Sequence, residues 1–308
     1  MEKLEKTNKI NSGDSEKKGS KVGQFFLHLV FIVLSLLYIL PFILMISVSF
    51  TDEATLTAGG FSLLPRVFSL EAYQLAFRNP KQLLQSYQVT ILFTIAGTLL
   101  STLIMSMMAY SLSRPNFKLR RVVTFMAFFT MLFSGGLVPS YLLNVRYLHL
   151  NNTFWIYVIP ALVSAWNLII IRTNFQQIPV SLIESAKIDG AGEMYICFRI
   201  VIPLSVPVLA TIAFLYFVGK WSDWMTAVIY IKSPNLYSLQ YLLQRILREV
   251  EFLKQLSAEN RALEAGAVFP TESFRFAMAL LTSGPVLVLF PFFQRYFSKG
   301  LTIGAVKG

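Results

Sequence analysis

The chain has 308 residues, of which 55% are hydrophobic and only 14% are charged. In an average soluble domain about 25% of the residues are charged. This composition argues against a soluble enzyme. The formal net charge of +11 would suggest a nucleic-acid partner only if the cations gathered on one face, and here they sort by membrane side instead.

Charge-free stretches predict six membrane spans. Six segments contain no Asp, Glu, Lys or Arg and run from 19 to 32 residues, while no other such segment exceeds 12 residues. A hydrocarbon core of about 30 Å needs roughly 20 apolar helical residues. We therefore expect an all-α membrane protein with six transmembrane helices, at about residues 25–47, 87–112, 122–137, 154–171, 200–219 and 276–293.

The distribution of charge predicts the orientation of these spans. With the N-terminus inside, the inner segments hold 16 Lys and Arg against 7 acids, while the outer loops hold 10 against 9. The positive-inside rule then places both termini in the cytoplasm. Most of the basic excess is explained by topology, so no nucleic acid is expected as a partner.

The first 24 residues are polar and Lys-rich, which is typical of a disordered cytoplasmic tail. The first span follows, with Pro41 near its outer end. The second half of the next outer loop, residues 61–77, is amphipathic and is expected to form a short helix at the outer interface. The second span ends at the segment SRPNFKLRR, whose four cations without an acid predict a strong inner anchor.

The third span is expected to break near its outer end, at Ser134, Gly135, Gly136 and Pro139. Backbone groups freed by such a break must face protein or water rather than lipid, so this end either lines an internal surface or is closed by a turn. A large outer loop, residues 220–272, separates the last two spans, and its segment 239–263 has the periodicity of a solvated helix. The six-helix domain covers residues 25–297, and residues 298–308 form a cytoplasmic tail.

Groups that could perform chemistry are missing from the predicted spans. No span interior contains an acid or a base, and such residues mark proton-coupled carriers. His28 and His149 are expected to be interfacial or packing residues. The chain has no P-loop, no metal-ligand spacing and no catalytic set, so we expect a non-enzyme without a cofactor of its own. Sodium coupling through backbone carbonyls stays open, and a self-contained ion-coupled carrier or channel is the alternative function.

The inner loop between the fourth and fifth spans, residues 173–203, is the most informative segment. Ser181 and Glu184 have the spacing of a capping box, and Gly190 is typical of a helix end in the left-handed conformation. The spacing predicts a helix of about nine residues between them. Asp189 in the last turn opposes the helix dipole, so it either caps the following helix or meets a cation on another protein.

The apolar residues of this short helix are Leu182, Ile183, Ala186 and Ile188. They form a stripe over little more than two turns, on a helix that projects from the membrane with nothing of its own to pack against. A partner protein is therefore expected to cover it.

Written out, the loop runs from Glu184-Ser185-Ala186 through Gly190 and Ala191 to Ile200-Val201-Ile202-Pro203. This resembles the EAA loop of binding-protein-dependent ABC importers, whose pattern is E-A-A, three residues, G, nine residues and I-x-L-P. The spacing matches throughout, while Ser185 replaces an Ala and Ile202 replaces a Leu of that pattern.

Two other segments carry the same resemblance. Residues 221–224, WSDW, look like the W-N-D-W segment of sugar permeases, and the C-terminal tail looks like the second permease subunit of maltose-type importers. FFTMLFSGGLVPSYLL and LYSLQYLLQRIL are similar to permeases for complex oligosaccharides, including uronate-containing glycans. The resemblance covers nearly everything after the N-terminal tail.

The resemblance implies the permease fold of type I ABC importers in a bacterial cytoplasmic membrane, with the short helix as the coupling helix to an ATPase. It implies a second related permease, two cytoplasmic ATPase subunits that bind ATP and Mg²⁺, and an extracellular or lipid-anchored sugar-binding protein. The residues assigned to coupling are Ser181, Glu184, Ser185, Ala186, Asp189, Gly190, Ala191, Ile200 and Pro203, and those of the tail that would reach the ATPases are Gly300, Leu301, Thr302 and Gly308.

Four further residues are candidates for the sugar path: Tyr141, Trp166, Asn167 and Trp224. Aromatic rings stack on the apolar faces of sugars, but such rings more often belong to a core or to an interfacial belt. A single uncharged Asn within a span is likewise more often a contact between helices than a ligand group.

Overall fold

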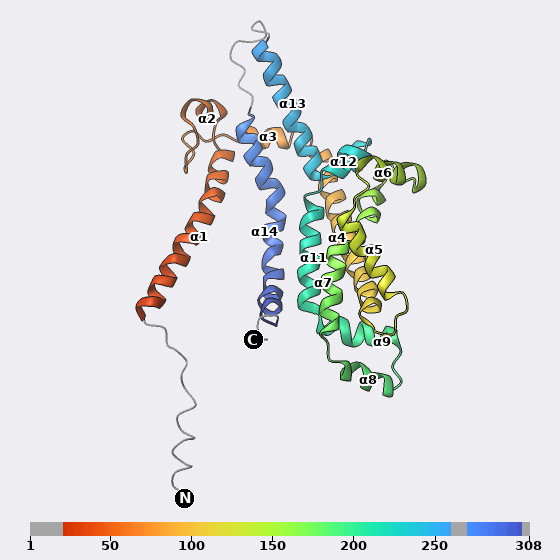
Figure 1. The fold of residues 1–308 in the computed structure, drawn as a ribbon. Coiled ribbons are helices and arrows are strands. Elements are labelled where there is room, and N and C mark those ends of the chain that lie inside the picture. The colour runs from red at the N-terminus through yellow and green to blue at the C-terminus, as the bar shows by residue number, and fades with distance from the viewer. Residues whose placement is uncertain (1–20, 260–269, 304–308) are drawn as a thin grey trace, which may run out of the picture.

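The structure is a computed structural model that describes residues 21–259 and 270–303 (Figure 1). Within these ranges the chain forms helices joined by turns, and an isolated antiparallel bridge between Thr51 and Phe68 is the extent of its β-structure. The predicted all-α class is therefore confirmed. The N-terminal tail up to residue 20 lies outside the described residues.

The first span is α1 (Lys21–Ser49), which begins four residues before its expected start and continues through Pro41. It contacts the rest of the molecule mainly along α14 and diverges from it toward its N-terminal end (Figure 1). Two short helices follow, α2 (Glu53–Gly59) and α3 (Glu71–Ala76). The short helix expected in the outer loop is α3, which buries two alanines against the core.

The centre of the bundle is α4 (Pro80–Ser113), which packs against α7 and α11. Asn79 caps its N-terminus by accepting a hydrogen bond from the Gln82 N–H, and Pro80 occupies the first helical position, where its missing N–H costs nothing. Small polar residues line its buried face, which allows neighbouring helices to approach closely. These residues are Ser86, Thr90, Thr94, Thr98 and Ser101.

The third predicted span is not one helix. Its helix α5 (Arg120–Leu132) stops five residues short of the expected end and is about 20 Å long at 1.5 Å per residue. The chain then breaks at the expected place, where Gly136 has a φ of 83° that only glycine adopts without strain. The short helix α6 (Leu137–Leu142) and the π-helical turn η1 (Leu143–Tyr147) follow.

The fourth predicted span is bent. The 3₁₀ turns η2 (Phe154–Tyr157) and η3 (Ile159–Ala161) meet α7 (Ala165–Gln176) at 49°. Ser164 sits at the bend and caps α7 by accepting the Asn167 N–H. A capping side chain at this point favours the start of a new helix over the continuation of the old one.

The fifth predicted span is also bent, and its first turns run in a different direction from the rest. The helical segments α9 (Glu193–Ile196), η4 (Cys197–Val201) and α10 (Ile202–Leu204) meet α11 (Val206–Trp221) at 82°. The expectation of a helix that starts at residue 200 is therefore wrong. Pro203 and Pro207 flank the bend, and each removes a backbone donor from the helical ladder.

The outer loop before the last span contains α12 (Met225–Tyr230), η5 (Pro234–Leu236) and α13 (Leu239–Glu259). The last of these confirms the predicted solvated helix over its described part. The sixth predicted span is α14 (Glu272–Ile303), which starts earlier and ends later than expected and contains Pro285 and Pro291.

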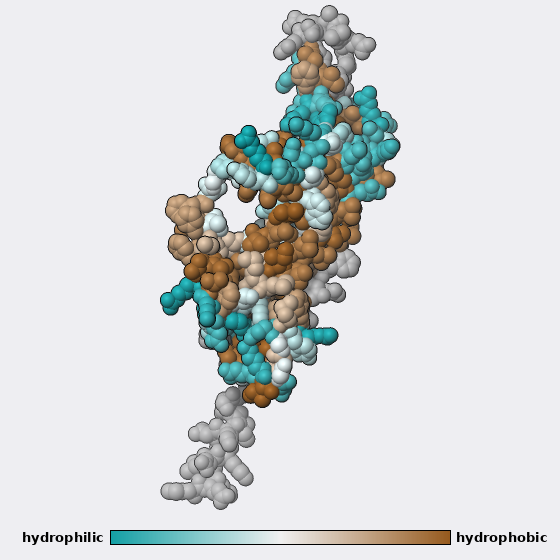
Figure 2. All heavy atoms as spheres, turned by 90° about the vertical axis from the view of Figure 1, so that its right-hand side faces the viewer, coloured by the Kyte–Doolittle hydropathy of each residue, from teal (hydrophilic) through white to brown (hydrophobic). Residues whose placement is uncertain are grey.

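Among the described residues, three helices are long and apolar enough to cross a membrane, and the number of spans rises to five if each bent pair counts as one span. A belt of hydrophobic residues lies between polar groups at both ends of the face in Figure 2. Two cores stabilise the bundle. One core lies at the end that carries α13 and includes Phe93 stacked on Tyr157, with ring centroids 4.3 Å apart. The other lies toward the opposite end and includes Phe175 and Ile196.

Candidate functional site

The short helix predicted in the inner loop is α8 (Val180–Ile188), nine residues long, at the end of the bundle opposite α13 (Figure 1). Its start differs from the expectation. Pro179 is the N-cap and no side chain caps the helix, so Ser181 is already the second helical residue and forms no capping box with Glu184. With Pro179, whose ψ is 127°, as the N-cap, the helix begins two residues earlier than it would with a Ser181 cap.

The end of α8 follows the prediction. Gly190 adopts a φ of 80°, the left-handed conformation expected of it. The Gly190 N–H donates to the Lys187 carbonyl at 3.0 Å, and the Ala191 N–H donates to the Ala186 carbonyl at 2.9 Å. This pair of bonds is the Schellman motif, which satisfies the last carbonyls of the helix and reverses the chain.

The apolar stripe of α8 divides between the molecule and solvent. Ile183 is 4% exposed and joins the core that contains Phe175 and Ile196. Leu182 and Ile188 are exposed, and Ile188 has 86% of its surface open. Ile183 and the partly buried Ala186 pack against the bundle, while Leu182 and Ile188 are left exposed.

The two acids that the sequence singled out also lack partners. Glu184 and Asp189 are exposed, and neither forms a hydrogen bond or ion pair through its side chain with the described residues. The N-cap of α9 is Gly192, without a side-chain bond, so Asp189 does not cap the next helix. A cation on another protein is the alternative that remains from the sequence analysis.

Lys187 of α8 and Glu193 of α9 are paired with each other. Lys187 forms an ion pair with Glu193 at 2.6 Å between Nζ and Oε1, and the Tyr110 hydroxyl donates to the other oxygen of the same carboxylate. The Arg114 guanidinium lies 4.7 Å above the Tyr110 ring. These contacts connect α8 and α9 to the end of α4, so the loop is attached to the bundle core.

The remaining motif residues support the chain reversal. Ala186, Ala191 and Ile200 are partly buried against the same core as Ile183, while Ser185 is exposed. Pro203 lies just before the 82° bend into α11. The structure thus places the nine residues that the sequence assigned to coupling on one continuous hairpin of helices, from α8 through α10.

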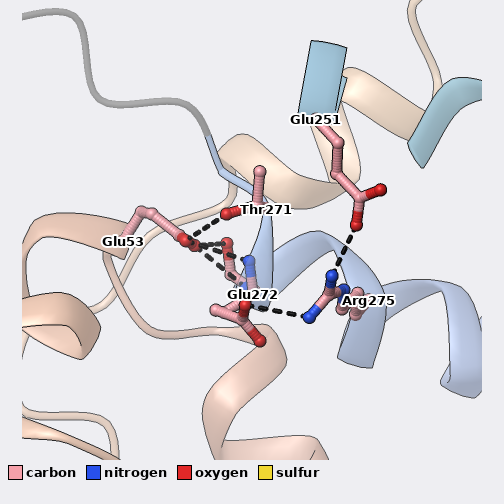
Figure 3. A network of polar contacts seen from close by, with 6 residues as sticks. Glu53, Glu251, Thr271, Glu272 and Arg275 are labelled. Atoms are coloured by element: carbon pink, nitrogen blue, oxygen red, sulfur yellow. Dashed lines mark hydrogen bonds and ion pairs between the residues drawn. The ribbon is translucent and has the colours of Figure 1, made fainter. Parts of the chain in front are cut away.

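A buried carboxylate at the opposite end was missed from the sequence. Glu53 of α2 is 1% exposed and accepts four hydrogen bonds, from the backbone N–H groups of Glu272 and Ser273 and from the hydroxyls of Thr271 and Ser273, at 2.8–3.0 Å (Figure 3). It therefore caps the N-terminus of α14 from another helix. Burial alone would raise the pKa of the Glu53 carboxyl, but these hydrogen bonds hold that pKa below its usual range.

Comparison with known proteins gives the family. Residues 101–303, which include the whole α8 hairpin, match the family described as "Binding-protein-dependent transport system inner membrane component". The chain belongs to this family. It is a membrane-embedded subunit of a transport system and not an enzyme.

Individual relatives match over most of the permease. Protein LplC of Bacillus subtilis is 41% identical over 270 residues, 88% of this chain and 90% of that protein. The polygalacturonan/rhamnogalacturonan transport system permease protein YtcP of the same organism is 38% identical over 277 residues, 90% of this chain and 95% of that protein. A solved chain from a bacterial ABC transporter involved in the import of the acidic polysaccharide alginate has a TM-score of 0.73 at 28% identity, over 91% of the permease and 99% of that chain.

The four candidates for the sugar path have different surroundings in the permease. Tyr141 stacks on Tyr230 with ring centroids 5.6 Å apart, and the Arg248 guanidinium lies 5.7 Å from the Trp224 ring. Trp166 is an exposed residue in the first turn of α7, next to the half-buried Asn167. Their role stays a prediction. Of the tail residues, Gly300, Leu301 and Thr302 lie in the last turns of α14, and Gly308 lies outside the described residues.

Proposed function

We propose that this permease imports oligosaccharides, including uronate-containing glycan fragments, across a bacterial cytoplasmic membrane. The proposal is supported by the names of its relatives, which include a polygalacturonan/rhamnogalacturonan permease, and by its structural similarity to an alginate importer. It agrees with the resemblance of the sequence to permeases for complex oligosaccharides.

The proposed assembly pairs this chain with a second related permease and two cytoplasmic ATPase subunits, which bind ATP and Mg²⁺. An extracellular or lipid-anchored sugar-binding protein delivers the cargo. The chain crosses the membrane six times with both termini in the cytoplasm, and α5 with the broken segment after it forms the span that is too short to qualify as a single helix. The charge-free stretch of residues 122–145 and the excess of cations on the inner side support this topology.

The observation that carries the mechanism is the state of α8. This helix is held by the buried Ile183, by the ion pair of Lys187 with Glu193 and by a hairpin that leads directly into α11. Leu182 and Ile188 are exposed, and the exposed side chains of Glu184 and Asp189 have no hydrogen-bond or ion-pair partner among the described residues. A protein cleft with apolar walls and a basic rim would complement this surface. Closure of the two ATPases then moves α8 as a rigid lever and reorients the bundle. The tail from residue 300 onward reaches toward the same ATPases.

The rival function, a self-contained ion-coupled carrier, lacks a comparable feature. Glu53 is the one carboxylate that is fully buried among the described residues, and its four hydrogen bonds commit it to capping α14. A group fixed in this way at one end of the bundle is not a proton relay through the centre.

The test uses the assembled transporter in proteoliposomes, with uptake and ATPase activity measured together. Glu184→Ala is expected to reduce ATP-driven uptake and its coupling to hydrolysis, because a charge at the ATPase contact is lost. Glu71→Ala is the matched control, since Glu71 is also an exposed glutamate on a short helix, at the opposite end of the bundle. Normal uptake and coupling in the Glu184 variant, or accumulation of sugar by this chain without ATPase subunits, would contradict the proposal.

A further inference from the structure

A basic cavity lies beside the α8 hairpin, between the turn that follows α4 and the end of α7. Its volume is about 920 Å³, and its charged lining is cationic throughout. Lys118, Arg120 and Arg121 come from the turn and from the first residues of α5, and Arg172 comes from α7. This cavity contains three of the four cations of the inner anchor, and the fold adds a fourth from a segment about fifty residues away.

The described part of the permease offers no anionic partner to these four cations. None of them forms an ion pair with a carboxylate of the described residues, whereas Lys187 nearby is paired with Glu193. The Arg172 Nε donates to the Leu112 carbonyl at 3.2 Å, which fixes this guanidinium at the cavity, and Arg120 lies near enough to repel it. Four cations around one cavity, with Arg172 fixed in place, favour an anion that bridges them.

Beside Asn116 and Thr124, the uncharged part of the lining is apolar, and the cavity is open to the surroundings. Phe125 and Phe128 of α5 line it, with 68% and 46% of their surfaces exposed. Val122, Met126 and Leu132 extend this exposed apolar surface along the helix. Figure 2, which looks at the α5 side of the molecule, shows hydrophobic residues meeting polar ones toward the α8 end. The ligand that fits such a site is negatively charged at one end and apolar at the other.

We propose that this cavity binds the phosphate headgroup of an anionic phospholipid, whose acyl chains lie along the exposed face of α5. Basic pockets between helices at the membrane surface bind such headgroups. Helix α5 begins at Arg120 without a side-chain cap, and the positive end of its dipole adds to the potential around the phosphate. A free phosphate ion shares the headgroup chemistry but leaves the phenylalanine wall uncovered, so the amphipathic source accounts for more of the site.

The experiment measures lipid retained by the assembled transporter, by native mass spectrometry after incubation with equal amounts of phosphatidylglycerol and phosphatidylcholine. Wild type is expected to retain phosphatidylglycerol selectively. The double variant Lys118→Gln with Arg121→Gln is expected to lose affinity by about fivefold for each removed cation. Arg114, Arg120 and Arg172 stay in place in this variant, so two of the four cations of the inner anchor and the Leu112 contact are kept.

The matched control is the double variant Arg146→Gln with Lys232→Gln, which removes the same charge from two exposed residues elsewhere in the molecule. It is expected to retain phosphatidylglycerol as wild type does. Equal retention of the two lipids by wild type would overturn the proposal, and this measurement does not depend on any variant folding. Equal losses in the two double variants would also overturn it, since they indicate a general effect of charge. Displacement of phosphatidylglycerol by an equal concentration of inorganic phosphate would assign the cavity to a free anion instead.

Discussion

Gly190 ends α8 in a conformation that other residues adopt only with strain, and this gives a sharp test of the lever. Its φ is 80°, while Gly192, two residues later, has a φ of −74° and a ψ of 161°. A Cβ atom added to either glycine meets no atom within 4 Å. Gly190→Ala and Gly192→Ala therefore add the same methyl group to open space and differ in backbone conformation alone.

The expected cost follows from that difference. An L-residue in the left-handed conformation costs roughly 1–2 kcal/mol, whereas the conformation of Gly192 is open to alanine without penalty. Relief of the strain would unwind the last turn and break the two hydrogen bonds of the Schellman motif, each of which contributes about 0.5–1.5 kcal/mol. A cost of 1–2 kcal/mol lowers the population of correctly ended α8 by roughly five- to thirtyfold.

The assay compares ATP-driven uptake, ATPase stimulation by the binding protein and affinity for the ATPase subunits in the two variants. Gly190→Ala is expected to weaken all three by a factor in that range, and Gly192→Ala is expected to match wild type. Gly190→Asn should lie between them, because asparagine tolerates the left-handed conformation better than alanine. Equal behaviour of the two alanine variants would refute the role of the helix end in coupling.

Four further predictions concern stability, each measured as the midpoint of thermal unfolding in detergent. Glu53→Gln should cost about 1–3 kcal/mol, because an amide cannot accept all four hydrogen bonds, while Glu71→Gln at an exposed site should change little. Folding lowers the pKa of Glu53, so its contribution to the free energy of unfolding is present above pH about 4.3, the usual pKa of a glutamate, and is lost as the pH falls below that value. A Glu53→Gln variant should lack this part of the pH dependence. Tyr157→Phe should cost about 1 kcal/mol, because its hydroxyl donates to the Leu236 carbonyl at 2.8 Å inside the core, and no loss would show that water replaces the bond. Lys187→Gln should cost at most about 1 kcal/mol, because its ion pair is half-exposed, and a larger loss would contradict this account.

Features that depend on neighbouring residues could be read from the sequence. The length of α8, its end at Gly190 and the break after α5 each follow from a few adjacent residues, because glycine conformation and helix capping are local. The start of α8 shows the limit of this reasoning. Ser181 and Glu184 have the right spacing for a capping box, but Pro179 took the cap position and left both residues inside the helix.

The bends of the fourth and fifth spans were not predicted from the sequence. Pro203 and Pro207 indicate a weak point in the helical ladder, but a proline alone does not determine whether a helix kinks slightly or turns by 82°. That angle depends on how α10 and α11 pack against their neighbours. A charge-free stretch measures apolar length, so it could not distinguish one straight span from two segments.

What the sequence determined by itself is the class of the molecule: an all-α membrane protein, a short exposed helix with a defined end, and the motif that indicates its family. The tertiary structure alone decided which distant groups meet. Glu53 accepts hydrogen bonds from groups about 220 residues further along the chain. Arg172 of α7 lines one cavity with cations from the turn after α4 and the start of α5. Local structure is set by hydrogen bonds between residues a few positions apart. The long-range contacts depend on which helices pack together, and the spacing of residues along the chain does not determine that.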